Sequence, residues 1–106
     1  MCGAAAFERV FRTGTRHDAV FLQLIAAPAA GTPGQVGYII GRRMVPLAVN
    51  RNRVRRRLRE AVRAARPVAA AFDIILRVRR PIARGDVLAV AAEGRALLGR
   101  LSAAAP

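Results

Sequence analysis

Lysine and tryptophan are absent from the sequence, and cysteine and histidine occur once each, as Cys2 and His17. A single cysteine cannot form an internal disulfide, so the fold does not require an oxidising compartment. Structural zinc sites take their ligands mainly from cysteine and histidine, so one of each excludes such a site. The 106 residues suffice for one small domain with one hydrophobic core. We therefore expect a single domain over residues 1–106 that folds without a bound metal.

Acidic residues are also scarce, because there are six of them against 19 arginines, and the formal net charge is +13. A small domain with this excess repels itself and attracts polyanions such as nucleic acid, an anionic membrane surface or an acidic protein. Guanidinium groups bind phosphate in a bidentate manner and stack on nucleobases. The charge alone leaves all three kinds of partner open.

The sequence has no long uninterrupted hydrophobic run. Residues 19–41 are uncharged, but they include Pro28, Pro33 and four glycines. A membrane-spanning helix needs about 20 predominantly apolar residues in succession, so this stretch reads as two strands and a turn. The N-terminus has no charged region followed by an apolar one, which argues against a signal peptide. We expect a cytoplasmic protein that does not enter the membrane.

Hydrophobic periodicity predicts helices over residues 4–13, 50–66 and 85–98 and strands over residues 20–25, 36–40 and 72–78. A further short strand is expected near Met44 and Val45 or earlier. Pro67 should end the second helix and Asp86 should be the N-cap of the last one. Residues 100–106 are expected to form a tail after an ordered core of about residues 5–99. The order αβββαβα indicates an α+β fold, a single-domain sandwich of helices on one sheet.

The helix over residues 50–66 is the most unusual segment. At roughly 100° per residue, its apolar side chains form one stripe, made of Val54, Leu58, Ala61, Val62 and Ala65. Arginines occupy the arc beside and opposite this stripe, at positions 55, 56, 59, 63 and 66. Only Glu60 offsets the eight arginines of the helix, and like charges four residues apart are destabilising. The pattern favours a helix that docks by its stripe and binds a phosphate backbone by its arginines.

Residues 48–60 read AVNRNRVRRRLRE, which resembles the A-V-x-R-N-R-x-K/R-R-x-x-R-E signature of the bacterial ribonuclease P protein component. The flanking segments FERVFRTG (residues 7–14), VGYIIGRR (36–43) and DIILRVR (73–79) also resemble segments of this family, in the same order. The resemblance covers roughly residues 7 to 98. Two features differ from the family pattern. Only six residues precede Phe7, where a basic extension is common, and no aromatic residue stands at Gln23 or Leu24.

The resemblance implies a sheet with a left-handed βαβ crossover through the arginine-rich helix, although the usual hand is right. It also implies an accessory protein subunit of a ribonucleoprotein endoribonuclease that removes 5′ leaders from precursor tRNA. In this family the RNA subunit performs the hydrolysis with bound Mg²⁺, so no catalytic residue is expected in the protein. The implied partners are the catalytic RNA and precursor tRNA, and the sequence indicates no protein partner.

The resemblance implies two sets of binding residues. The RNA-facing set consists of the signature residues and the next arginine of the same arc: Arg51, Asn52, Arg53, Arg55, Arg56, Arg59 and Arg63. A cleft for the single-stranded leader would use Phe7 and Phe11 together with the exposed face of the strand over residues 72–78. Strand alternation assigns Ile75, Arg77 and Arg79 to that face. Ordinary core packing remains the alternative for both phenylalanines.

Other readings of the sequence remain open. A ribosomal protein or another structural RNA-binding module would share the size and charge, but it has no reason to contain the signature. A basic amphipathic helix can also bind a membrane surface or an acidic partner. However, the apolar stripe contains no Trp, Phe or Ile and is needed for packing the domain. The six carboxylates are scattered and the one serine is Ser102, so no catalytic triad or acid–base pair is expected.

Overall fold

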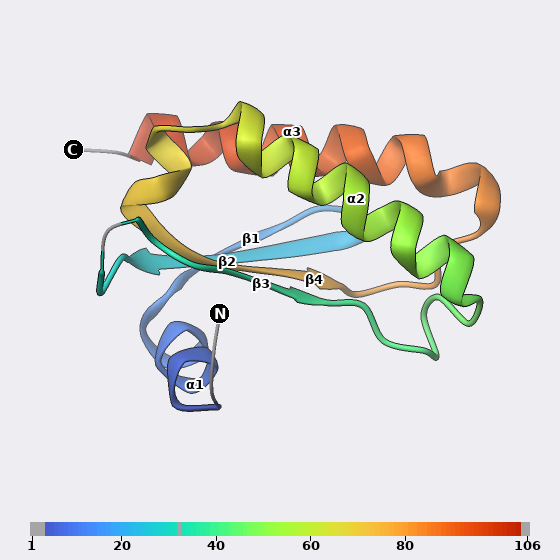
Figure 1. Ribbon diagram of the computed structural model, residues 1–106, viewed down its shortest axis with the longest axis horizontal. Coiled ribbons are helices and arrows are strands. Elements are labelled where there is room, and N and C mark those ends of the chain that lie inside the picture. Colours follow the sequence, from blue (N-terminus) through green and yellow to red (C-terminus); the bar gives the residue numbers. More distant parts are fainter. Residues whose placement is uncertain (1–3, 32, 105–106) are drawn as a thin grey trace.

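The computed structural model describes residues 4–31 and 33–104 (Figure 1). The helices and strands follow each other as α1 (Ala4–Thr13), β1 (Thr15–Asp18), β2 (Leu22–Pro28), β3 (Val36–Ile39), α2 (Ala48–Ala64), β4 (Phe72–Val78) and α3 (Val87–Ala104). Short 3-10 turns precede β4 and α3, as η1 (Val68–Ala71) and η2 (Arg84–Asp86). The predicted order αβββαβα and the α+β class are therefore confirmed.

The strands form one mixed sheet in the order β1-β2-β4-β3. β2 is antiparallel to both of its neighbours, whereas β3 and β4 are parallel and are connected through α2. In Figure 1 both parallel strands point to the right, α2 lies above the sheet, and β3 is nearer to the viewer than β4. This connection is a left-handed crossover, the rare hand that the family resemblance implied.

Helices cover both faces of the sheet, with α2 and α3 on one face and α1 on the other (Figure 1). The main core lies under α2 and α3, where Leu24, Ile74 and Leu76 of the sheet are fully buried against the helices. The predicted apolar stripe of α2 is confirmed: Val54, Leu58, Ala61 and Val62 are buried, and Ala65 is partly buried against them. Burial of this stripe directs the opposite, arginine-rich side of α2 outward.

A smaller core lies between α1 and the sheet. Val10, Ile25, Ala27 and Ile75 are its buried members, and Phe7, Phe11 and Ile39 pack against them while partly exposed. A buried polar group supplements this packing, because the Asp73 carboxylate of β4 pairs with the Arg9 guanidinium of α1. Asp73 also accepts hydrogen bonds from the backbone N–H groups of Ala30 (3.2 Å) and Gln35 (2.9 Å). One carboxylate thus joins α1, the β2–β3 connection and β4.

The three strands predicted from hydrophobic residues are present as β2, β3 and β4, and the differences lie in some of their bounds and in the position of the additional strand. β4 has the predicted bounds, but β2 begins at Leu22 instead of residue 20. Met44 and Val45 form no strand, and Val45 instead fills the main core. The additional strand is β1, whose sequence TRHD contains no hydrophobic residue. β1 is an edge strand that pairs only with β2, so it needs no apolar face to be stable there.

The helix ends also differ from expectation. The Asp86 carboxylate accepts a hydrogen bond from the Ala83 N–H (2.9 Å), so it caps η2 one turn before α3. α3 continues to Ala104 because Leu101 is still buried in the core, so the end predicted at Leu98 is wrong. Residues 100–104 therefore belong to a helix and not to a tail. Cys2 and residues 105–106 lie outside the described residues. None of the described helices is both long enough and apolar enough to cross a membrane.

Candidate nucleic-acid interface

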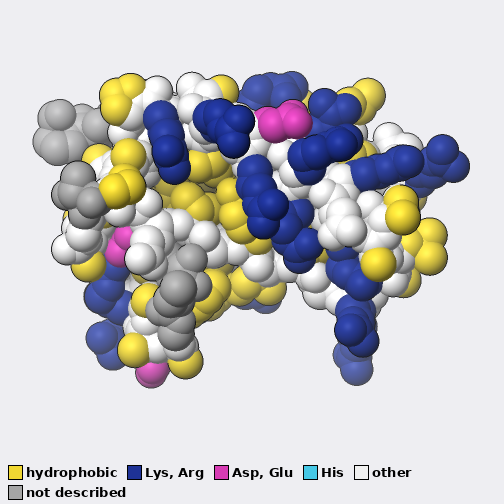
Figure 2. All heavy atoms as spheres, in the orientation of Figure 1, with side chains coloured by type: hydrophobic (Ala, Val, Ile, Leu, Met, Phe, Trp, Pro, Cys, Tyr) yellow, Lys and Arg dark blue, Asp and Glu magenta, His cyan; other side chains and the backbone are white. Residues whose placement is uncertain are grey.

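The outward side of α2 is a surface of guanidinium groups. Arg53, Arg56, Arg59 and Arg63 are exposed, and Arg55 and Arg57 are partly exposed. Figure 2 shows basic side chains gathered along the upper part of this view, over α2, with little acidic surface among them. Glu60 lies 3.8 Å from Arg57, and their side chains are 57% and 42% exposed, so this ion pair offsets little of the charge. The predicted RNA-facing arginines other than Arg51 therefore share one surface.

Arg51 is an exception within the signature. Its Nη1 donates hydrogen bonds to the carbonyls of Val45 (2.9 Å) and Pro46 (2.8 Å), so it fastens the segment that leads into α2. Leu47, the residue before the helix, provides no side-chain cap, and Arg51 contributes polar contacts at this end. Asn52 is exposed and accepts a hydrogen bond from Arg55 (3.2 Å). The signature thus contains one mainly structural arginine among arginines that face solvent.

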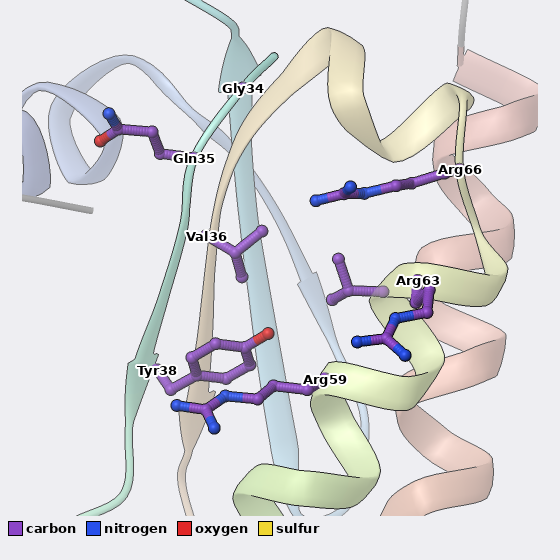
Figure 3. Close-up of a pocket in the computed structure, with 8 residues that line it drawn as sticks. Gly34, Gln35, Val36, Tyr38, Arg59, Arg63 and Arg66 are labelled. Atoms are coloured by element: carbon purple, nitrogen blue, oxygen red, sulfur yellow. The ribbon is translucent and has the colours of Figure 1, made fainter.

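A cleft of about 480 Å³ separates α2 from β3. The residues that line it are Gly34, Gln35, Val36, Tyr38, Arg59, Val62, Arg63 and Arg66. Figure 3 shows Tyr38 and the three arginines converging on the space between the helix and the strand. The Arg59 Cζ atom lies 6.0 Å from the centre of the Tyr38 ring, which is within cation–π range. Sequence reasoning assigned Tyr38 to a strand but not to a site, because the cleft forms only when α2 crosses β3.

The surroundings of Tyr38 in this cleft shift the pKa of its hydroxyl. Partial burial raises the pKa of its hydroxyl, and the positive charges of Arg59 and Arg66 lower it by less. Loss of hydration disfavours the phenolate more than the arginines favour it. The hydroxyl is therefore protonated at neutral pH and can donate a hydrogen bond.

A second basic cleft of about 400 Å³ lies between α2 and the start of α3. Arg53, Arg56 and Arg57 line its α2 side, and Arg84 of η2 lines the other. Arg84 was not predicted as a site residue, because it lies outside the arginine-rich helix and this cleft forms only where η2 meets α2. This cleft extends the positive surface of α2 toward α3.

The predicted leader-cleft residues lie on the α1 face of the sheet, but they differ in exposure. Phe7 and Phe11 are partly buried against the smaller core, and Arg77 is exposed. Ile75 is fully buried beneath α1, so the expectation that it lies on an exposed face is wrong. Strand alternation gives the face of a residue but does not show which helix covers it. Arg79 donates to the Ala19 carbonyl (3.2 Å) and so helps to hold the end of the sheet.

Further groups surround the exposed part of the α1 face. Arg16 of β1 lies with its Cζ atom 5.9 Å from the centre of the Phe11 ring and donates to the Phe11 carbonyl (3.2 Å). The family pattern has an aromatic residue where this sequence has Gln23 or Leu24. Gln23 lies on the α1 face and pairs in register with Arg77, whereas Leu24 lies in the main core. Phe11, Arg16 and Arg77 therefore provide an aromatic and cationic surface that the sequence only partly indicated.

The buried or partly buried carboxylates have structural partners. Asp73 binds Arg9 and two backbone N–H groups, and Glu93 of α3 accepts hydrogen bonds from the N–H groups of Phe21 (2.9 Å) and Leu22 (3.2 Å). Within residues 4–31 and 33–104, no three His, Cys, Asp or Glu side chains are grouped so that they could hold a metal ion. Three arginines line the cleft between α2 and β3, and four line the cleft between α2 and α3.

The fold and this surface define the class of protein: a small α+β protein with a left-handed crossover and a basic helical face. The family model for ribonuclease P matches residues 2–102. The ribonuclease P protein component of Chloroflexus aggregans is 41% identical over 78 residues, which cover 73% of this chain and 57% of that protein. The chain therefore belongs to the ribonuclease P protein family, and it spans little more than half the length of this relative.

Solved structures share the fold. The RNase P protein of Staphylococcus aureus matches with a TM-score of 0.74 at 19% identity, over 99% of this chain and 93% of that one. The RNase P protein of Thermotoga maritima matches with a TM-score of 0.72 at 23% identity, over 89% of each chain. The arrangement of helices on the sheet, including the crossover through α2, is thus the family fold.

Proposed function

We propose that this chain acts in the cytoplasm as the protein subunit of ribonuclease P and assists the removal of 5′ leaders from precursor tRNA. The observation on which the proposal rests is the arginine face of α2, which contains the family signature and points away from the core. In this proposal the catalytic RNA, with its Mg²⁺ ions, performs the hydrolysis, and the protein binds RNA without a catalytic residue of its own.

Contact with the catalytic RNA is assigned to α2. Its apolar stripe is used for docking on the sheet, so its exposed guanidinium groups are available for phosphates. Each phosphate that an arginine neutralises releases condensed counterions, which makes binding strong at low salt and weak at high salt. The cleft between α2 and α3 adds Arg84 to the same surface. A structured RNA that follows α2 can therefore contact both sets of arginines.

Contact with the single-stranded leader is assigned to the opposite face of the sheet, beside α1. Nucleobases stack on aromatic side chains with about 1–3 kcal/mol per base, and neighbouring arginines bind the backbone. The partly exposed Phe11 with Arg16 and Arg77 offers both kinds of group. Because α1 and α2 lie on opposite faces of the sheet, the two RNAs can be bound at the same time (Figure 1).

Reconstitution with the catalytic RNA tests the proposal. The purified chain is added to that RNA at low Mg²⁺, and cleavage of precursor tRNA is measured together with affinity for leader-bearing and mature tRNA. We expect faster cleavage and tighter binding of the leader-bearing substrate. A structural RNA-binding module, such as a ribosomal protein, would bind the RNA without either effect. Absence of both effects would show that the proposed function is wrong.

A further inference from the structure

The cleft between α2 and β3 is hollow and has an apolar wall, and it differs from the cleft between α2 and α3 because an aromatic ring, that of Tyr38, lines it. Val36 and Tyr38 of β3 face Val62 of α2 across it, and all three belong to or pack against the main core. Its volume of about 480 Å³ lies within the range of roughly 300–1,000 Å³ that is typical of small-ligand pockets. A phosphate held on a convex helix surface does not require such a hollow.

The rim of the cleft is positively charged. Arg59, Arg63 and Arg66 converge on it from α2 and from the turn that follows (Figure 3). In the part of the chain that the structure describes, none of these three arginines is paired with a carboxylate. None of the described residues that line the cleft is acidic. An anion that entered would meet guanidinium groups without displacing an existing ion pair.

Apolar walls with a cationic rim match a ligand that has a flat apolar part and an anionic part. A nucleotide has both, because its base stacks on aromatic rings and its phosphate binds guanidinium groups. Base–aromatic stacking is stronger than an exposed cation–π contact, so a base can replace Arg59 against the Tyr38 ring. The displaced guanidinium is then free to bind the phosphate. The Tyr38 hydroxyl, protonated at neutral pH, adds a hydrogen-bond donor.

We infer that the α2–β3 cleft binds one unpaired nucleotide of an RNA strand, with its base against Tyr38 and its phosphate between Arg63 and Arg66. A base in a continuous duplex cannot enter, because it is stacked between its neighbours and paired. The inference builds on the RNA binding in the proposed function and names one contact within it. It also gives the cleft a role distinct from the convex arginine face, which binds phosphates of any strand.

Photocrosslinking tests the position of the nucleotide. A single-stranded RNA oligonucleotide that contains 5-iodouridine is irradiated with the full chain, and the crosslinked tryptic peptides are identified. We expect a crosslink at Tyr38, in the peptide over residues 17–42 that trypsin releases after Arg16 and Arg42. A fully base-paired RNA of the same sequence should give no such crosslink. Crosslinks confined to other peptides, or equal crosslinking of the duplex at Tyr38, would overturn the inference.

Binding measurements with matched variants test the energetics. We expect Tyr38→Leu, which keeps an apolar side chain but removes the ring, to weaken binding of the single strand roughly tenfold. Tyr38→Phe should retain most of the affinity, and Arg66→Ala should weaken binding and reduce its salt slope by about one. Arg95→Ala, which removes one exposed charge from α3, is the control for net charge. Equal losses for Arg95→Ala and Arg66→Ala, or no loss for Tyr38→Leu, would contradict the inference.

The experiments separate this inference from the proposed function. Thermal unfolding shows whether Tyr38→Leu is folded, and the crosslink in the unaltered chain does not depend on any variant. If the chain stimulates precursor tRNA cleavage but does not crosslink at Tyr38, only the cleft inference is wrong. If it crosslinks at Tyr38 but gives no stimulation, the proposed function is wrong and the cleft still binds an unpaired nucleotide.

Discussion

The Asp73 carboxylate pairs with the Arg9 guanidinium and thereby ties α1 to β4, one of the two inner strands of the sheet. The Asp73 side chain is only 8% exposed, whereas the Arg9 side chain is 33% exposed. The two partners therefore differ in what their removal leaves behind. Without Arg9, the carboxylate keeps two backbone donors. Without the carboxylate, two backbone N–H groups and a guanidinium lose their acceptor at once.

This asymmetry predicts different costs for the two single substitutions. We expect Asp73→Ala to lower the free energy of unfolding by about 3 kcal/mol, because three part-buried interactions with a charged acceptor are lost together. Arg9→Ala should cost about 1 kcal/mol, because water can partly replace the guanidinium. Chemical denaturation measures both values, and equal losses would show that the backbone hydrogen bonds of Asp73 contribute little. Arg9→Ala should also weaken leader binding if α1 forms that surface.

The signature arginines should divide by function when they are replaced one at a time. Arg51→Ala removes two hydrogen bonds from a charged donor to backbone carbonyls and should destabilise the fold by roughly 1–2 kcal/mol. Arg53→Ala removes an exposed charge from a crowded helix and should leave stability within about 0.5 kcal/mol. Its effect should appear in RNA binding, as a salt slope reduced by about one. Thermal melts and salt-dependent binding of both variants decide whether one arginine is structural and the other functional.

Gly34 permits a close approach between the segment before β3 and the start of β4. A Cβ atom at Gly34 would lie 2.0 Å from the Phe72 carbonyl oxygen, and the Gly34 N–H donates to the Ala70 carbonyl (2.7 Å). Because the obstacle is backbone, Gly34→Ala should destabilise the protein by about 2 kcal/mol or more. Gly31→Ala is the matched control, since nothing lies within 4 Å of its added Cβ. Similar unfolding midpoints for the two variants would contradict the close approach.

The features that sequence could predict are those that one segment determines by itself. The alternation in β4 and the helical spacing in α1 fixed the bounds of both elements, and the stripe of α2 predicted which side is buried. β1 was missed because the pairing of TRHD at a sheet edge depends on β2 and not on its own hydrophobicity. The end of α3 was misplaced because the burial of Leu101 depends on the surrounding core.

The candidate binding residues also divide into those that one segment determines by itself and those that depend on other segments. The arginine arc follows from helical geometry, so its residues were predicted together. Ile75 was assigned to the correct face, but the packing of α1 over that face removes it from solvent. The α2–β3 cleft needs Tyr38 and the arginines to meet across a crossover connection, and no periodicity in either segment predicts that meeting. Contacts between segments that are distant in the sequence therefore could not be predicted from the sequence.

Tyr38 is the one tyrosine of the chain, and there is no tryptophan, so its ionisation can be followed alone by phenolate absorbance. Burial raises the pKa of its hydroxyl, so we expect a titration midpoint above the ordinary value of 10.0. The folded state keeps this proton to a higher pH than the unfolded chain does. The contribution of the protonated Tyr38 hydroxyl to the free energy of unfolding is therefore fully present below pH 10.0 and is lost as pH rises through the folded-state pKa. Arg59 lowers this pKa, so Arg59→Ala should move the midpoint higher, whereas Arg95→Ala should not move it. A midpoint at or below the ordinary value would show that the ring is not buried against α2.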